Sequence, residues 1–127
     1  MEQRAARILV VDDEDAIRLT LDLILRRRGY TVVTAPNGEA ALELIEQQPL
    51  DLLLLDLMMP GLSGVEVARR AQTLQPGAAV LILTGSTPLE GAAATDGLEQ
   101  FDYLLKTASP QDVPKRVAAI LREQSSR

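Results

Sequence analysis

Polar residues that can do chemistry stand at the ends of four apolar runs in this sequence. Asp12 and Asp13 follow the first run, Asp56 follows a second, and Thr84 and Lys106 close two later ones. If these runs are strands of an open parallel sheet, their carboxyl ends meet at one edge, where such sheets bind ligands. We therefore expect three carboxylates, one hydroxyl and one ammonium group to share a pocket.

Carboxylates crowded in this way favour a bound cation, because like charges a few ångströms apart repel each other. The chain has no Cys and no His, and hard oxygen ligands alone select Mg²⁺ or a similar ion such as Mn²⁺. A carboxylate screened by that ion can attack phosphorus and form an aspartyl phosphate. Asp56 is the expected nucleophile, since it stands alone after a central strand, and Asp13, with Asp12 more indirectly, would hold the metal. Lys106 would neutralise the phosphoryl oxygens, and Thr84 would donate a hydrogen bond to them.

Each of these residues also has an ordinary structural explanation. Asp12 and Asp13 are suitable helix caps, and Asp56 is a common turn former at the end of a strand. Taken alone, Thr84 belongs to a turn and Lys106 is a solvated surface charge. The functional interpretation depends on their joint occurrence at four different strand ends.

Alternating strand-like and helix-like segments predict an α/β fold around a parallel sheet. Continuous apolar runs are typical of strands covered on both faces, whereas the run at 31–34 alternates and suits a sheet edge. The expected strands are residues 8–11, 31–34, 52–55, 80–83 and 103–105, and the expected helices are residues 15–28, 39–47, 64–74 and a last one from 109–110.

Two segments weaken the helical pattern. The stretch at 88–100 contains Pro88, Gly91 and Gly97, which oppose a stable helix, so a short or frayed element is expected there. The last helix is expected to open with Ser109 as its cap and Pro110 as its first residue. Pro114 conflicts with that start, because a proline one turn in would lose a backbone hydrogen bond.

Length and composition limit the possible functions. The chain has 127 residues, 46% of them hydrophobic and 24% charged, which predicts one globular domain. The net charge of −5 argues against direct binding to nucleic acid or anionic lipid. No apolar run approaches the roughly 20 residues of a membrane span. We expect a cytoplasmic protein that uses neither disulfides nor imidazole catalysis.

These motifs resemble the receiver domain of two-component response regulators, a CheY-like family. The resemblance is carried by residues 8–14 and 56–64, with Thr84-Gly85 and residues 103–106 in support, and it covers about residues 7–122. It implies a single receiver domain over 1–127, with loose ends at 1–5 and 124–127. The implied fold is a flavodoxin-like, doubly wound α/β fold, with a five-stranded parallel sheet in order 2-1-3-4-5 and five helices.

The resemblance also implies a function. Asp56 would take a phosphoryl group from a phosphohistidine on a histidine kinase or histidine phosphotransfer protein, with Mg²⁺ bound by Asp13, Asp56 and the Met58 backbone carbonyl. Thr84 would then move toward the phosphate while Tyr103 turns inward, remodelling the face made by residues 88–105 and the last helix. A downstream protein would bind that face. The chain would be a signalling switch with at most self-phosphorylation and autodephosphorylation activity.

The sequence departs from the family where that face is built. Thr107 follows Lys106 where the family usually has proline, so we expect a trans bond there, since a cis bond before a non-proline residue costs about 2.5 to 4 kcal/mol. Residues 99–101 (Glu-Gln-Phe) replace the usual Gly-Ala pair. The family's common dimer through this face is therefore not carried over.

Two other classes of function stay open. A receiver-like docking module could keep the fold without phosphorylation. An α/β enzyme or cofactor binder is less favoured, because the acids after the first strand replace a flavin phosphate loop and lack the pattern of an aspartyl phosphatase. Ile17 also stands where a calcium-binding loop needs glycine. The sequence does not name the partner kinase, the signal or the output, nor does it distinguish a stand-alone regulator from part of a longer one.

Overall fold

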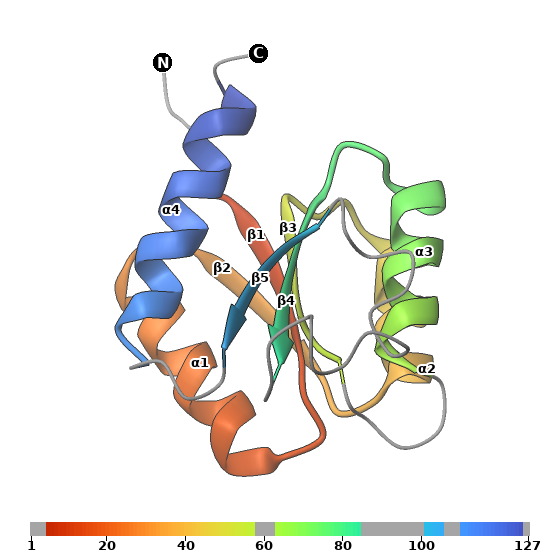
Figure 1. The fold of residues 1–127 in the computed structure, drawn as a ribbon, viewed down its shortest axis with the longest axis horizontal. Helices are drawn as coiled ribbons and strands as arrows, with labels where there is room; N and C mark the ends of the chain where they lie inside the picture. Colours follow the sequence, from red (N-terminus) through yellow and green to blue (C-terminus); the bar gives the residue numbers. More distant parts are fainter. Residues whose placement is uncertain (1–4, 58–62, 85–100, 106–109, 126–127) are drawn as a thin grey trace.

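The computed structural model describes residues 5–57, 63–84, 101–105 and 110–125. Within them, five strands and four helices form one α/β unit (Figure 1). The strands are β1 (Arg7–Val11), β2 (Thr31–Ala35), β3 (Leu52–Asp56), β4 (Ala79–Thr84) and β5 (Asp102–Leu105). The helices are α1 (Asp15–Arg27), α2 (Gly38–Gln47), α3 (Gly64–Leu74) and α4 (Asp112–Ser125). The element expected at 88–100 lies outside these residues, so the fifth helix stays a prediction.

The strands form one parallel sheet in the order β2-β1-β3-β4-β5, which confirms the predicted topology. The central strands β1 and β3 are buried almost throughout, in agreement with their continuous apolar sequences. At the edge, β2 buries Val32 and Ala35 but exposes Thr31 and Thr34. The alternation in sequence therefore located the edge strand correctly.

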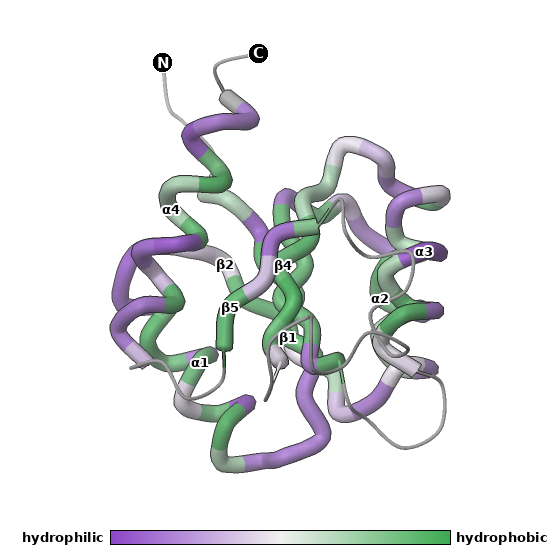
Figure 2. The backbone as a smooth tube through the Cα atoms, in the orientation of Figure 1, coloured by the Kyte–Doolittle hydropathy of each residue, from purple (hydrophilic) through white to green (hydrophobic). Residues whose placement is uncertain are grey.

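Helices cover both faces of the sheet. Figure 1 shows α1 and α4 on one side and α2 and α3 on the other. Ile8 and Val10 of β1 belong to the core beneath α1 and α4, whereas Leu9 and Val11 belong to the opposite core. Figure 2 accordingly shows hydrophobic strands at the centre of the molecule. Among the described residues, no helix combines the length and the apolar character needed to cross a membrane.

Local signals set most helix boundaries. Gly29 follows α1 with φ +94°, a left-handed conformation that favours glycine after a helix. Asn37 caps α2 by accepting a hydrogen bond from the Ala40 amide at 2.8 Å. Ser63 caps α3 by accepting one from the Glu66 amide at 3.2 Å. These caps explain why the predicted bounds of the first three helices agree with the structure to within one residue.

The predicted start of the last helix is wrong by two residues. Pro110 lies in a turn rather than at the first helical position, and α4 begins at Asp112. Pro114 is therefore the third residue of the helix. The amides of a first turn have no acceptor within the helix, so a proline there sacrifices no backbone hydrogen bond. The expected conflict with Pro114 disappears for that reason.

Gly64, the first residue of α3, lies against the end of β3. A Cβ atom at this position would stand 2.7 Å from the Asp56 carbonyl oxygen and 2.8 Å from the Leu57 carbonyl oxygen. Both are backbone atoms, which cannot rotate away as a side chain could. The absence of a side chain at Gly64 therefore allows α3 to pack against the segment that carries Asp56.

We expect Gly64→Ala to lower the free energy of unfolding by about 1 to 3 kcal/mol, the usual cost of overpacking a buried contact. Urea denaturation followed by circular dichroism measures this change. Gly77→Ala is the matched control, because no atom lies within 4 Å of its added Cβ; its effect should stay within about 0.5 kcal/mol. Equal stability of the two variants would contradict the close contact at Gly64.

Candidate functional site

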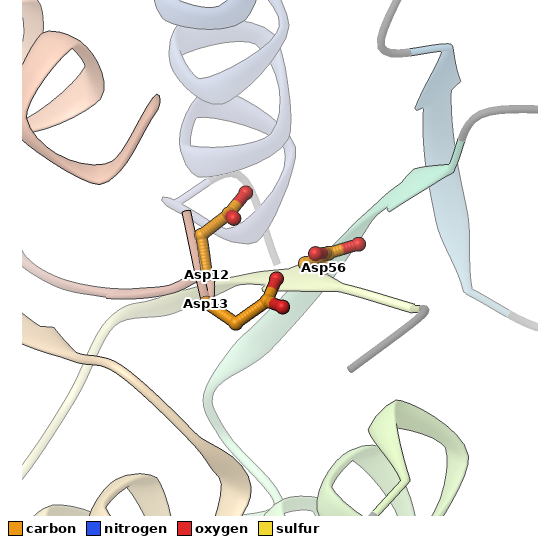
Figure 3. A group of neighbouring side chains, drawn as sticks. All are labelled: Asp12, Asp13 and Asp56. Atoms are coloured by element: carbon orange, nitrogen blue, oxygen red, sulfur yellow. The ribbon is translucent and has the colours of Figure 1, made fainter. Parts of the chain in front are cut away.

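The acidic site is built by two neighbouring strands. β1 ends at Val11 and is followed by Asp12 and Asp13, while Asp56 is the last residue of β3. Val11 pairs with Leu55 in the parallel register, so the next residue of each strand is an aspartate. Figure 3 shows the three side chains coming from these adjacent strand ends, with Asp13 directed toward Asp56. Strand register thus brings Asp12 and Asp56 together, although they are more than forty positions apart in sequence.

One carboxylate oxygen from each of Asp12, Asp13 and Asp56 lies within 4.8 Å of the other two. Asp12 and Asp56 are 0% and 1% exposed, whereas Asp13 is exposed. Three negative charges this close repel one another, and the repulsion grows where water is excluded. A hard cation with oxygen ligands would relieve it, and Mg²⁺ and Mn²⁺ accept such ligands. The donor set therefore fits a divalent metal with one accessible side.

Several hydrogen bonds fix the backbone around Asp12. Its amide donates to the Ala35 carbonyl oxygen at 3.2 Å, which continues the pairing of β1 with β2. Its Oδ1 accepts from the Glu14 amide at 2.9 Å, closing a tight turn. Glu14 is the N-cap residue of α1 and supplies no side-chain cap. Asp12 therefore orders the loop before α1 through this turn and does not act as the cap residue of the helix.

The other predicted site residues lie in different places. Thr84 ends β4 and is 4% exposed; because Leu83 pairs with Asp56, Thr84 stands one residue further along the same sheet edge. Tyr103 lies in β5 and is 44% exposed, away from the three acids. Met58 and Lys106 fall outside the described residues, as does the bond between Lys106 and Thr107.

One residue beside the acids was missed by the sequence interpretation. Arg18 lies on α1, and its guanidinium donates hydrogen bonds to the Asp12 carbonyl oxygen and to Asp15. The spacing of three residues between Asp15 and Arg18 in a predicted helix indicates an ion pair. No sequence pattern indicated the bond back to Asp12, which depends on how the loop folds over the helix.

Comparison with known proteins settles the family. A sequence model of the response regulator receiver domain matches residues 8–118. This chain belongs to the response regulator receiver domain family. Membership identifies it as a signalling domain rather than a metabolic enzyme, as the sequence predicted. The acidic sheet edge is thus the expected location of the receiver's chemistry.

Relatives and solved structures agree with this assignment. The transcriptional regulatory protein PhoP for alkaline phosphatase synthesis in Bacillus subtilis is 40% identical over 116 residues, which cover 91% of this chain and 48% of PhoP. The receiver spans about half the length of the curated relatives it matches. A CheY-like receiver domain protein from Methanospirillum hungatei has a TM-score of 0.88 and 31% identity, covering 97% of this chain and 98% of that one. The Thermotoga maritima response regulator TrrA, solved in complex with Mg²⁺-BeF, has a TM-score of 0.77 and 34% identity, covering 90% of this chain and 97% of TrrA.

The receiver's crowded acids should lower its stability when no cation is present. In EDTA, we expect Asp13→Asn to raise the free energy of unfolding by about 1 kcal/mol, since it removes one charge from the cluster. Asp13 suits this test because it is exposed and no described hydrogen bond depends on it. Thermal or urea denaturation measures the change.

Glu43→Gln is the control for this prediction, since it removes one negative charge from an exposed position in the middle of α2. It should leave stability within about 0.5 kcal/mol of the parent. If both variants gained the same stability, the gain would reflect net charge rather than crowding at the sheet edge.

Proposed function

We propose that this receiver accepts a phosphoryl group on Asp56 in a reaction that depends on Mg²⁺ or Mn²⁺. The observation that carries the proposal is the buried Asp56 carboxylate, clustered with Asp12 and Asp13 at adjacent strand ends. The donor would be a phosphohistidine of a histidine kinase or a histidine phosphotransfer protein. The 127 residues contain no histidine, so this donor would lie outside them.

Each acid has a distinct proposed role. An oxygen of Asp56 attacks phosphorus, the bond from phosphorus to the partner's imidazole nitrogen breaks, and the imidazole retains the bonding electrons. Asp13 and Asp12 would hold the cation and orient Asp56. When bound, the cation offsets negative charge on the phosphoryl oxygens.

Four further residues have proposed roles from the family resemblance. The Met58 carbonyl would complete the protein ligands of the cation, and Lys106 would neutralise the phosphoryl group. Thr84 would donate a hydrogen bond to it, and its place at the same edge as Asp56 supports that role. Tyr103, exposed on β5, would turn inward as the domain switches. A protein target would recognise the changed surface formed by residues 88–105 and α4.

The proposal concerns one receiver domain over residues 1–127, with a core of about 7–122, acting in the cytoplasm. Its net charge of −5 disfavours direct contact with nucleic acid. That expectation is limited to this domain, because the relatives named as transcriptional regulators are about twice as long. Any control of transcription by the whole protein would therefore be a separate function.

Incubation with acetyl phosphate and Mg²⁺ should add the mass of one phosphoryl group, as measured by mass spectrometry of the intact protein. Asp56→Asn should prevent the addition, because an amide oxygen is a poor nucleophile. Asp51→Asn is the matched control; it makes the same change just before the opposite end of β3 and should be phosphorylated like the parent. A parent protein that gains no mass would favour a docking module that works without phosphorylation.

Beryllofluoride with Mg²⁺ imitates an aspartyl phosphate without a covalent bond. We expect it to raise the melting temperature of the parent, since a ligand that binds only the folded state stabilises that state. Asp56→Ala should abolish the increase, measured by differential scanning fluorimetry with Mg²⁺ alone as the baseline. An equal increase in the variant would place the beryllofluoride elsewhere and contradict the role of Asp56.

A further inference from the structure

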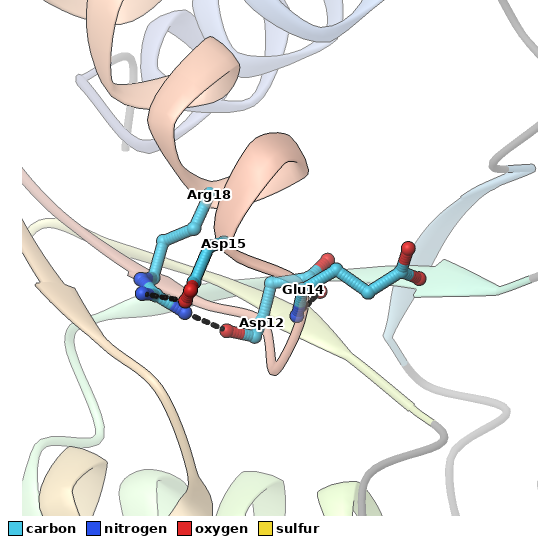
Figure 4. A network of polar contacts seen from close by, with 4 residues as sticks. All are labelled: Asp12, Glu14, Asp15 and Arg18. Carbon is cyan, nitrogen blue, oxygen red and sulfur yellow. Dashed lines mark hydrogen bonds and ion pairs between the residues drawn. The ribbon is translucent and has the colours of Figure 1, made fainter.

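Arg18 connects the first helix to the loop that carries two of the acids. Its Nη1 donates to the Asp12 carbonyl oxygen at 2.7 Å, and its Nη2 donates to Asp15 Oδ1 at 2.5 Å (Figure 4). The two bonds are made at opposite ends of the loop from Asp12 to Asp15. The planar guanidinium therefore holds the end of β1 at a fixed distance from the start of α1.

This loop determines where the Asp13 carboxylate lies. Asp13 is exposed, and no hydrogen bond or ion pair within the described part of the chain holds its side chain. Its position therefore follows from the backbone on either side. Asp12 is held by the Arg18 guanidinium and Glu14 by its bond to Asp12 Oδ1. Of these two contacts, only the Arg18 bond comes from a side chain beyond the loop.

The ion pair with Asp15 makes this arrangement compatible with a cation site. Arg18 is 19% exposed and Asp15 is 90% exposed, so the pair is too solvated to add much stability. It does balance the charge of the guanidinium. Arg18 can thus hold the loop in place without leaving an unbalanced positive charge near the proposed metal ligands.

We propose that Arg18 is a positioning residue for the divalent cation: it holds the Asp12 carbonyl so that the Asp13 carboxylate faces Asp56. This inference rests on the proposed function, because it assumes that the acidic cluster binds a cation. Groups that orient metal ligands from behind typically change metal affinity by about 10- to 100-fold when they are removed. Arg18 is such a group, because it contacts the backbone of Asp12 and would not contact the cation itself.

Geometry and charge make opposite predictions for Arg18→Met. If Arg18 acted only through its charge, its removal would leave the site more negative, and cations would bind more tightly. If it positions the loop, its removal frees Asp13, and cations bind more weakly despite the added negative charge. The direction of the change therefore distinguishes positioning from simple electrostatics.

Loss of the free Mn²⁺ signal in electron paramagnetic resonance measures the dissociation constant directly, at constant ionic strength and well below the melting temperature. We expect Arg18→Met to raise this constant about tenfold. Asp15→Asn keeps an oxygen that can accept the Arg18 bond, so its constant should change by no more than about threefold. Arg27→Met, which removes the same charge from the exposed last turn of α1, should leave it within about twofold.

Binding by Arg18→Met that is as tight as in the parent, or tighter, would overturn the inference. So would an equal loss of affinity in Asp15→Asn, since the effect would then depend on the Arg18–Asp15 pair and not on the bond to the Asp12 carbonyl. A melting curve in EDTA establishes that each variant is folded at the temperature of the titration. If the parent itself bound no Mn²⁺, the proposed function would fail instead, so the two failures are distinguishable.

Discussion

Three carboxylates within 4.8 Å of one another are held at a sheet edge where two of them are almost completely buried. Repulsion between them opposes folding, and the protein must supply the free energy that keeps them together. Most of it comes from the two apolar cores on either side of the sheet. The same arrangement makes the site responsive, because any ligand that offsets negative charge at this edge is favoured by relief of the repulsion.

The strands hold Asp56 and the backbone of Asp12 more rigidly than a loop could. β1 and β3 are central strands, hydrogen-bonded on both sides, and Asp12 extends the pairing of β1 by one further bond to Ala35. Gly64 lets α3 pack directly on the backbone at Asp56 and Leu57. The backbone that carries the Asp56 carboxylate is therefore in direct contact with α3. Thr84, at the carboxyl end of β4, lies next to the end of β3 in the same sheet.

The match to the receiver family over residues 8–118 includes the acidic sheet edge and the strands that build it. The acids, their strands and the glycine contact belong to the part that the family resemblance explains. The departures from the family that the sequence shows include Thr107, which lies outside the described residues. Relatives about twice as long as this chain are named transcriptional regulatory proteins. The chemistry proposed for Asp56 therefore concerns the shared receiver and not the remaining half of those relatives.

The resemblance to the receiver family implied the sheet order, while the sequence by itself determined the strands and the identity of the three acids. It could do so because fully buried strands are apolar at every position, and an aspartate that ends such a run must lie at the sheet edge. Only the tertiary structure decided that Asp13 is the exposed member of the cluster, that α4 begins at Asp112, and that Arg18 reaches back to Asp12. These features depend on the direction of short loops and on the reach of a long side chain. Neither leaves a periodic pattern in the sequence.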